Sequence, residues 1–276
     1  MHMSFKIIDF LLRKPRNRKV LDYMEIHVTN HCNLNCACCC HFAPLAETYF
    51  MPIDIFKKDI ERMSYLSKGK ILRLRLMGGE PLLHPSINEF MEISRYNFPN
   101  SDIAIHSNGI LLSQMSDDFW VKCCTNNIGI ILSYYPIDID YTLLCKKARL
   151  HNVVLKIEID TNVKLFRNFK MDLKGLQNPK MSWYHCHHGN SSVNLFEGKL
   201  YTCDILAHSK HLSKYFNLAL EYTKQDCIDI YEEKNMKDIL CKLNKPHPFC
   251  KYCCPNDSKI IEWKVSKKEL QEWAKI

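Results

Sequence analysis

The feature that most constrains this chain is a short loop with three closely spaced cysteines. Cys32, Cys36 and Cys39 follow the pattern Cys-x3-Cys-x2-Cys, just after a strand-like run that ends at Val28. Cysteine thiolates in such loops are how proteins hold iron–sulfur clusters, and three of them can hold three irons of a 4Fe–4S cube. No fourth cysteine completes the pattern. We therefore expect an open iron that binds an external ligand, as in a catalytic rather than a structural metal site.

The number of cysteines favours metal binding over disulfide bonds. The chain has 15 cysteines in 276 residues, whereas disulfide scaffolds are short and secreted. The N-terminal apolar run over 5–12 is broken by charges, is too short to cross a bilayer and lacks a cleavage site. We therefore expect a cytoplasmic protein with no membrane partner.

The net charge of +8 suits an anionic substrate such as a phosphorylated or nucleotide-linked compound. The densest basic run, over 13–19, has no aromatic residues interleaved. Aromatic residues among basic ones are typical of nucleic-acid grooves, so we expect no nucleic-acid partner.

Strand-like and helix-like segments alternate between residues 23 and 159. The expected strands are 23–28, 71–77, 102–107, 128–133 and 154–159. The expected helices are 54–67, 86–97, 117–126 and 139–151. This rhythm predicts an α/β fold with a parallel sheet and outer helices. Five or six units are too few for an eight-stranded barrel, so we predict a partial (β/α)6 TIM-like barrel.

Three of the expected strands alternate apolar and polar residues, although strands covered on both faces are normally apolar throughout. The polar positions are Glu25, His27, Arg73, Arg75, Lys156 and Glu158. Because side chains alternate between faces along a strand, we expect these residues to line a wet, substrate-sized lumen. Arg75, Lys156 and Glu158 are the candidate substrate residues. The alternatives are antiparallel strands with one solvent face, or buried ion pairs.

Two further motifs follow the cysteine loop, each at the end of an expected strand. They are Gly78-Gly79-Glu80-Pro81 and Ser107-Asn108-Gly109. The three motifs, in this order, resemble the signature of the radical S-adenosylmethionine (radical SAM) enzymes. The resemblance covers roughly residues 20–255. It implies a 4Fe–4S cluster and SAM as cofactors.

The resemblance also implies roles for individual residues. The amino and carboxylate groups of SAM would occupy the open iron, and reductive cleavage of SAM would give a 5′-deoxyadenosyl radical that abstracts a hydrogen atom. The backbone of Gly78 and Gly79, together with Glu80, would hold the SAM amino group. The ribose or carboxylate of SAM would be within reach of Ser107, Asn108 and Ser133.

Each of these motifs also has a simpler alternative. The three cysteines could instead form a zinc site completed by His31 or His41, and the glycine and serine motifs could be ordinary turns. Cys38 stands where the family usually has an aromatic residue near the adenine, and Phe42 or Tyr49 would have to take its place. Cys38 itself, like Cys40, does not extend the three-cysteine spacing.

Four cysteines near the C-terminus form a second set. Cys186, Cys203, Cys250 and Cys253 follow the pattern Cys-x16-Cys-x46-Cys-x2-Cys. This arrangement resembles the twitch domain, a truncated relative of the SPASM domain that holds one auxiliary 4Fe–4S cluster, here saturated by four cysteines. A four-cysteine zinc ribbon is the alternative, and Cys254 could replace Cys253.

The changes in pattern divide the chain into three parts. We expect an N-terminal extension at 1–20, the barrel core at 21–175 and a twitch/SPASM-like domain at 176–276, with a hairpin at 193–202 that turns at Glu197-Gly198.

The resemblance implies a radical SAM oxidoreductase of the dehydrogenase or epimerase type. Its substrate would be a polar small molecule such as a sugar, an aminocyclitol or a nucleotide-sugar-like compound, and flavodoxin or ferredoxin would supply electrons. One alternative is a peptide-modifying enzyme, although the expected 20-residue extension is short for a leader-binding domain. A second alternative is a non-catalytic iron–sulfur or zinc protein.

Overall fold

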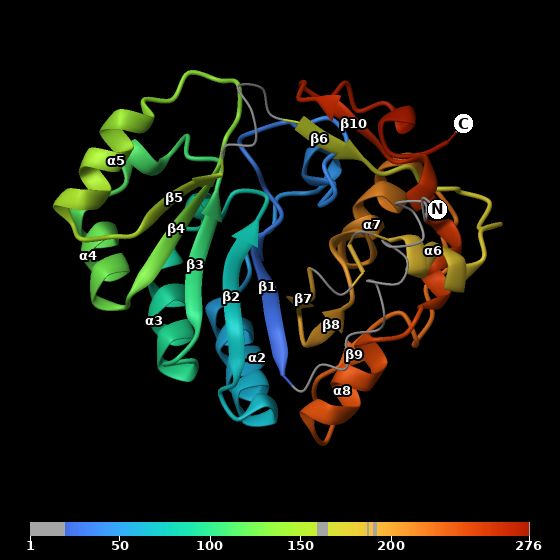
Figure 1. Cartoon of the computed structure of the whole chain (residues 1–276), viewed down its shortest axis with the longest axis horizontal. Coiled ribbons are helices and arrows are strands. Elements are labelled where there is room, and N and C mark those ends of the chain that lie inside the picture. Colours follow the sequence, from blue (N-terminus) through green and yellow to red (C-terminus); the bar gives the residue numbers. More distant parts are fainter. Residues whose placement is uncertain (1–19, 159–164, 187, 190–191, 276) are drawn as a thin grey trace, which may run out of the picture.

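The computed structural model describes residues 20–158, 165–186, 188–189 and 192–275. Five strands form a parallel sheet in the order β5-β4-β3-β2-β1 (Figure 1). They are β1 (Leu21–Thr29), β2 (Ile71–Gly78), β3 (Asp102–Ser107), β4 (Ile128–Ser133) and β5 (Leu155–Glu158). The helices between them are α2 (Ile53–Ser67), α3 (Ile87–Asn97), α4 (Asp117–Thr125) and α5 (Tyr141–Leu150).

The predicted α/β fold class with a parallel sheet and outer helices is confirmed. Each of these elements begins and ends within two residues of its predicted bounds. The helices cover the outer face of the sheet (Figure 1) because their apolar sides, such as Phe56 and Ile60 of α2, pack on the apolar side chains of the strands. The expected extension at 1–20 lies outside the described residues except for its last residue, and Ile159 of the fifth expected strand also lies outside them.

The predicted partial TIM-like barrel is also confirmed, but its sixth parallel strand does not directly follow β5 in the chain. Strand β6 (Leu165–Asn168) does not join the large sheet but pairs antiparallel with β10 (Lys259–Glu262). The parallel strand on the other side of β1 is instead β7 (Asn194–Phe196). Strand β7 forms the predicted hairpin with β8 (Lys199–Tyr201), and β9 (Ile228–Asp229) completes an eight-stranded sheet. A strand from the C-terminal region therefore covers the edge of β1.

The remaining helices belong mostly to the C-terminal half of the chain. They are α6 (Pro179–His185), α7 (Asp204–Phe216) and α8 (Met236–Leu243). Short 3-10 helices are η1 (Ala43–Leu45), η2 (Pro81–Leu83), η3 (Leu112–Gln114), η4 (Pro248–Tyr252), η5 (Pro255–Asp257) and η6 (Leu270–Glu272). Within the described ranges, none of the helices is long and apolar enough to cross a membrane.

Apolar packing links the two parts of the chain that the sequence separates near residue 175. The main core contains Leu21 and Met24 of β1 together with Leu195 of β7 and Leu200 of β8. A second core joins Phe42, next to the cysteine loop, with C-terminal residues such as Trp273. The division at residue 175 stays a prediction, and both cores run across it.

Hydrogen bonds strengthen this junction. The buried carboxylate of Asp59 on α2 accepts hydrogen bonds from the Gly198 N–H and the Tyr231 hydroxyl, both at 2.7 Å. The Arg62 guanidinium donates to the Ile230 carbonyl at 2.9 Å and the Glu233 carbonyl at 2.6 Å. Helix α2 is therefore fastened to the β7–β8 turn and to the segment after β9.

We predict that Asp59→Ala lowers the free energy of unfolding by about 1–3 kcal/mol, because it leaves the buried Gly198 N–H without its acceptor and removes the hydrogen bond from Tyr231. Urea unfolding of the variant measures this loss. Glu61→Ala, on the exposed side of the same helix, is the control and should change stability by less than about 0.5 kcal/mol. If Asp59→Ala were as stable as Glu61→Ala, the hydrogen bonds to Asp59 would not stabilise the junction, which would contradict this account.

Candidate functional site

The three cysteines of the first motif gather in the loop that follows β1. The thiol of Cys32 lies close to those of Cys36 and Cys39; burial, with a smaller contribution from these neighbouring thiols, raises its pKa to about 12. All three are free of disulfide bonds. Three clustered thiols are a suitable donor set for three irons of a cluster.

Hydrogen bonds are directed at the sulfur atoms of this loop. The Leu34 N–H donates to Cys32 Sγ at 3.4 Å, and Trp263 Nε1–H donates to Cys36 Sγ at 3.1 Å. Tyr135 also hydrogen-bonds to Cys36, and its pKa is raised mainly by burial. The sequence does not predict Trp263 or Tyr135 at this site, because each lies outside the three motifs.

The segment after β10 fixes the backbone of the same loop. Ala37 N–H donates to the Lys264 carbonyl at 2.9 Å, and Ser266 N–H donates to the Asn35 carbonyl at 2.8 Å. Trp273 Nε1–H donates to the Cys39 carbonyl at 2.9 Å. Residues more than 200 positions along the chain therefore shape the cysteine loop.

The other two cysteines of the loop face different surroundings. Cys38, with its backbone in the left-handed region at φ 60°, lies in a surface pocket with Lys264 and Glu272. Cys40 hydrogen-bonds to Asp204. The expectation that Cys38 and Cys40 do not extend the three-cysteine set stays a prediction.

The glycines of the second motif pack directly on the chain that leads into the cysteine loop. A Cβ atom on Gly78 would lie 2.2 Å from the Thr29 carbonyl oxygen, and one on Gly79 would lie 2.2 Å from that of His31. Gly79 N–H donates to Thr29 O and Glu80 N–H to His31 O, each at 2.8 Å. The close approach expected from two glycines is therefore made to residues 29–31.

Glu80 joins the three motifs in one buried hydrogen-bond network. Its Oε1 accepts from the Ser107 hydroxyl at 2.8 Å and from Leu82 N–H at 3.1 Å, and its Oε2 accepts from Asn108 N–H at 2.8 Å. The Asn108 amide in turn donates to Asn33 Oδ1, within the cysteine loop, at 2.7 Å. Burial raises the pKa of Glu80 to about 7.

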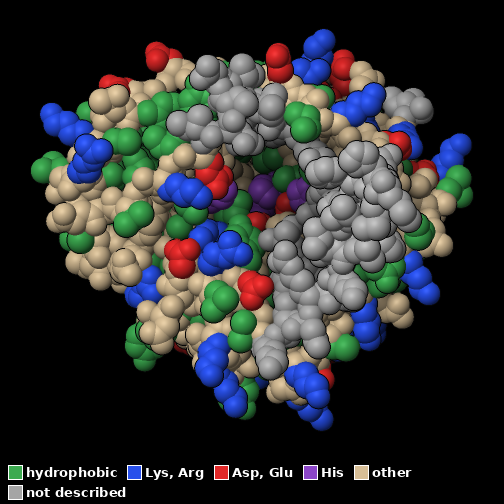
Figure 2. All heavy atoms as spheres, viewed as in Figure 1, with side chains coloured by type: hydrophobic (Ala, Val, Ile, Leu, Met, Phe, Trp, Pro, Cys, Tyr) green, Lys and Arg blue, Asp and Glu red, His purple; other side chains and the backbone are tan. Residues whose placement is uncertain are grey.

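The inner face of the sheet carries polar side chains, as the alternating strands predict. Figure 2 shows a hollow in the middle of the molecule with histidine and acidic side chains inside it. Glu25 and His27 of β1 are buried; burial raises the pKa of Glu25 and lowers that of His27. His106 of β3 hydrogen-bonds to the Ser133 hydroxyl at 2.9 Å and lies 3.6 Å from Glu158.

A scan against protein-family models matches residues 26–123 to the Radical SAM superfamily. The chain contains a radical SAM domain. The match runs from β1 to α4 and includes the three motifs. The cofactors expected from the resemblance, a 4Fe–4S cluster and SAM, are those of this superfamily.

Curated relatives match the same part of the chain. The GTP 3′,8-cyclase of Chlorobaculum tepidum is 33% identical over 107 residues, which are 39% of this chain and 32% of the relative. That of Clostridium acetobutylicum is 40% identical over 102 residues, 36% of this chain and 30% of the relative. The chain thus matches about a third of the length of these relatives.

Solved structures with a similar arrangement include BtrN in complex with AdoMet and 2-DOIA. That structure is 14% identical, with a TM-score of 0.49, and the match covers 85% of this chain and 93% of BtrN. Streptococcus suis SuiB bound to S-adenosylmethionine is 18% identical, with a TM-score of 0.38, over 53% of this chain and 34% of SuiB.

The candidate substrate residues differ in their positions around the radical SAM domain. Arg75 donates to the Asp102 carboxylate at 2.7 Å and to the Asp102 and Leu74 carbonyls, so its guanidinium is engaged beside the first residue of β3. Lys156 and Glu158 lie 3.8 Å apart, on a strand at the edge of the sheet. We therefore leave Arg75 out of the proposed substrate site.

Phe42 and Tyr49, the aromatic residues considered for the adenine, are engaged in packing. Phe42 is buried against Trp273, with ring centroids 6.3 Å apart. The Tyr49 hydroxyl donates to Glu197 at 2.7 Å, and its ring contacts Phe196.

The four C-terminal cysteines come together from three separate segments. Cys186 directly follows α6, Cys203 precedes α7, and Cys250 and Cys253 lie within and directly after η4. Burial and the neighbouring thiols of Cys186 and Cys253 raise the pKa of Cys203, and Cys186 and Cys253 also neighbour Cys250. All four are free of disulfide bonds, which suits a four-thiolate metal centre.

We predict that Gly79→Ala costs at least about 1–3 kcal/mol of stability, the usual range for overpacking, because its Cβ would meet the His31 backbone. Urea unfolding and iron content after cluster reconstitution measure the effect. Gly129→Ala on β4 is the matched control, since its Cβ would be no nearer than 3.6 Å to other atoms, and it should be neutral or slightly stabilising. Equal tolerance of both substitutions would contradict the close contact.

Proposed function

We propose that this protein reductively cleaves SAM and abstracts a hydrogen atom from a polar small molecule bound in the barrel. The observation that carries the proposal is the Glu80 network, which ties the cysteine loop to the ends of β2 and β3. This network supports cluster and SAM sites beside the polar inner face of the sheet. Oxidation or epimerisation of a sugar, an aminocyclitol or a nucleotide-sugar-like compound is the proposed reaction class.

Cys32, Cys36 and Cys39 are the proposed ligands of the 4Fe–4S cluster. Three clustered thiols that accept hydrogen bonds suit this group, and such bonds to sulfur influence a cluster's reduction potential. When bound, the cluster supplies the electron that cleaves SAM. The protein's part is to hold SAM in a fixed orientation and to exclude water from the reaction.

Glu80 is the proposed partner of the SAM amino group. An ionised carboxylate offers about four acceptor positions, and the described contacts of Glu80 use three of them. The three donors fix the carboxylate, and one acceptor position remains for an ammonium group. The backbone of Gly78 and Gly79, with Ser107, Asn108 and Ser133, completes the proposed SAM site.

The substrate is proposed to bind along the inner face of the sheet near His106, Lys156 and Glu158. Charged and hydroxyl groups on this face suit a polar molecule. The GTP 3′,8-cyclases that match the radical SAM domain are named for a nucleotide, which belongs to the same polar, anionic class. This supports a nucleotide-linked substrate without assigning one.

Residues 176–276 are proposed to form a twitch/SPASM-like unit with an auxiliary 4Fe–4S cluster on Cys186, Cys203, Cys250 and Cys253. Four thiolates would saturate such a cluster, so it would exchange electrons rather than bind substrate. We also propose an electron donor such as flavodoxin or ferredoxin and a cytoplasmic location, because exposed clusters are damaged by oxygen.

The first test is production of 5′-deoxyadenosine. Anaerobically reconstituted protein given dithionite and SAM should form 5′-deoxyadenosine and methionine. Cys32→Ala should abolish both products, because the cluster loses a ligand. Cys38→Ala is the matched control from the same loop and should keep the activity. Activity in Cys32→Ala, or none in the unmodified protein, would overturn the proposed function.

The second test separates the two candidates for the fourth auxiliary ligand. Cys253→Ser should lower the iron content from about eight to about four per chain. Cys254→Ser should keep it, because the Cys254 thiol hydrogen-bonds to Lys275. Four irons together with one zinc in the unmodified protein would show a zinc ribbon in place of the auxiliary cluster.

A further inference from the structure

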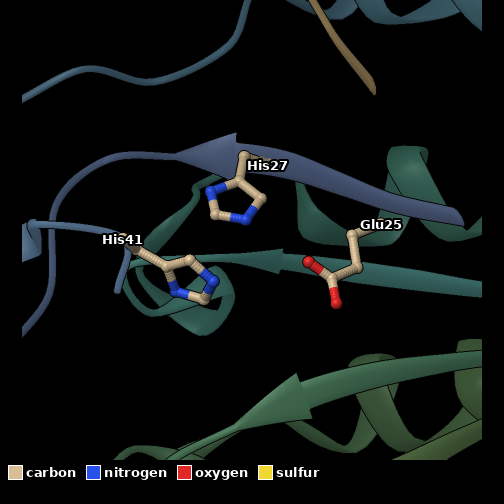
Figure 3. A group of neighbouring side chains, drawn as sticks. All are labelled: Glu25, His27 and His41. Carbon is tan, nitrogen blue, oxygen red and sulfur yellow. The ribbon is translucent and has the colours of Figure 1, made fainter. Parts of the chain in front are cut away.

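A buried carboxylate and two histidines converge inside the barrel, outside the three cysteine ligands. One ligand atom each of Glu25, His27 and His41 lies within 4.8 Å of the other two. Figure 3 shows the Glu25 carboxylate directed towards the rings of the two histidines, which come from β1 and from the end of the cysteine loop. Glu25 and His27 are 5% and 1% exposed.

One nitrogen of this group has no partner in the described part of the chain. Nε2 of His27 is buried and makes no hydrogen bond there. The ring of His27 stacks on His208, with centroids 3.9 Å apart, and meets His41 edge-on at 4.5 Å. An unpaired buried nitrogen costs about 1–3 kcal/mol, so its retention beside Glu25 points to a ligand.

We propose that Glu25, His27 and His41 bind a divalent first-row transition-metal ion such as zinc. Two histidines and one carboxylate form the donor set of several catalytic zinc sites, and the same set holds ferrous ion in other enzymes. The three residues are close enough to reach a common ion. None of them belongs to the proposed cluster or SAM ligands.

Hydrogen bonds around Glu25 hold it in position for such an ion. The Tyr23 hydroxyl donates to Oε1 at 2.8 Å, and the Asn194 amide donates to Oε2 at 3.2 Å. Asn194 also donates to Asp204 at 3.1 Å and lies 3.3 Å from Nε2 of His208. Outer contacts of this kind orient metal ligands and raise metal affinity.

An ion held by three protein ligands keeps at least one position open. A hydroxyl or carboxylate group of the molecule bound in the barrel is the class of ligand that would fill it. The binding of substrate to the ion rests on the proposed function, whereas the proposal of the ion does not.

The test uses the full chain with its clusters reconstituted anaerobically, so that the cysteines are occupied, and zinc sulfate as the probe, without SAM. After gel filtration we expect one additional zinc per chain. Zinc X-ray absorption should show nitrogen and oxygen ligands at about 2.0–2.1 Å and no sulfur at about 2.3 Å. No retained zinc, or zinc bound to sulfur alone, would overturn the proposal.

Substitutions assign the ligands. Loss of an outer contact typically lowers metal affinity by about 10–100-fold. Glu25→Gln and His27→Asn each remove a direct ligand, so each should weaken zinc binding by at least this factor. Tyr23→Phe removes only such an outer contact and should cause a smaller loss. It tests the site even if the first two variants do not fold.

His106→Asn is the matched control, because His106 lies on the same face of the sheet but pairs with Ser133. It should retain zinc. Equal zinc loss in this variant would refute the assignment. The two proposals can fail separately, since zinc binding without 5′-deoxyadenosine, or the reverse, identifies which one is wrong.

Discussion

The contact between the ends of β1 and β2 is the constraint on which the site depends. The backbone of Gly78 and Gly79 lies so close to residues 29–31 that a Cβ atom at either position would collide with it. The chain therefore leaves β1 along one path into the cysteine loop. The Glu80 network then ties that loop, through Asn33, to the end of β3. Moving any of these segments would disturb all three motifs together.

The C-terminal part of the chain builds the site as much as the barrel does. Strand β7 extends the sheet beside β1 and supplies Asn194 to Glu25. The segment after β10 supplies Trp263, whose indole donates to Cys36. The four cysteines of the proposed auxiliary centre lie in the same C-terminal half of the chain that makes these contacts. We infer that the electronic environment of the cluster proposed at Cys32, Cys36 and Cys39 depends on residues far from its own loop.

Local patterns were enough to predict the strands, the helices and the three motifs, because each depends on periodicity or on spacing within a few residues. Long-range pairing was not predictable in this way. Strand β7 beside β1 and the approach of Trp263 to Cys36 arise from segments far apart in the chain. Arg75 is a further example. The alternation of polar and apolar residues along β2 predicts that it lies on the inner face, but does not predict its ion pair with Asp102.

A crystal structure of the anaerobically reconstituted protein with SAM tests the central claim most directly. We predict an iron cube held by Cys32, Cys36 and Cys39, with the SAM amino and carboxylate groups on the fourth iron and Glu80 within hydrogen-bonding distance of the amino group. A protein side chain on the fourth iron, or a cube that uses Cys38 or Cys40, would contradict the account.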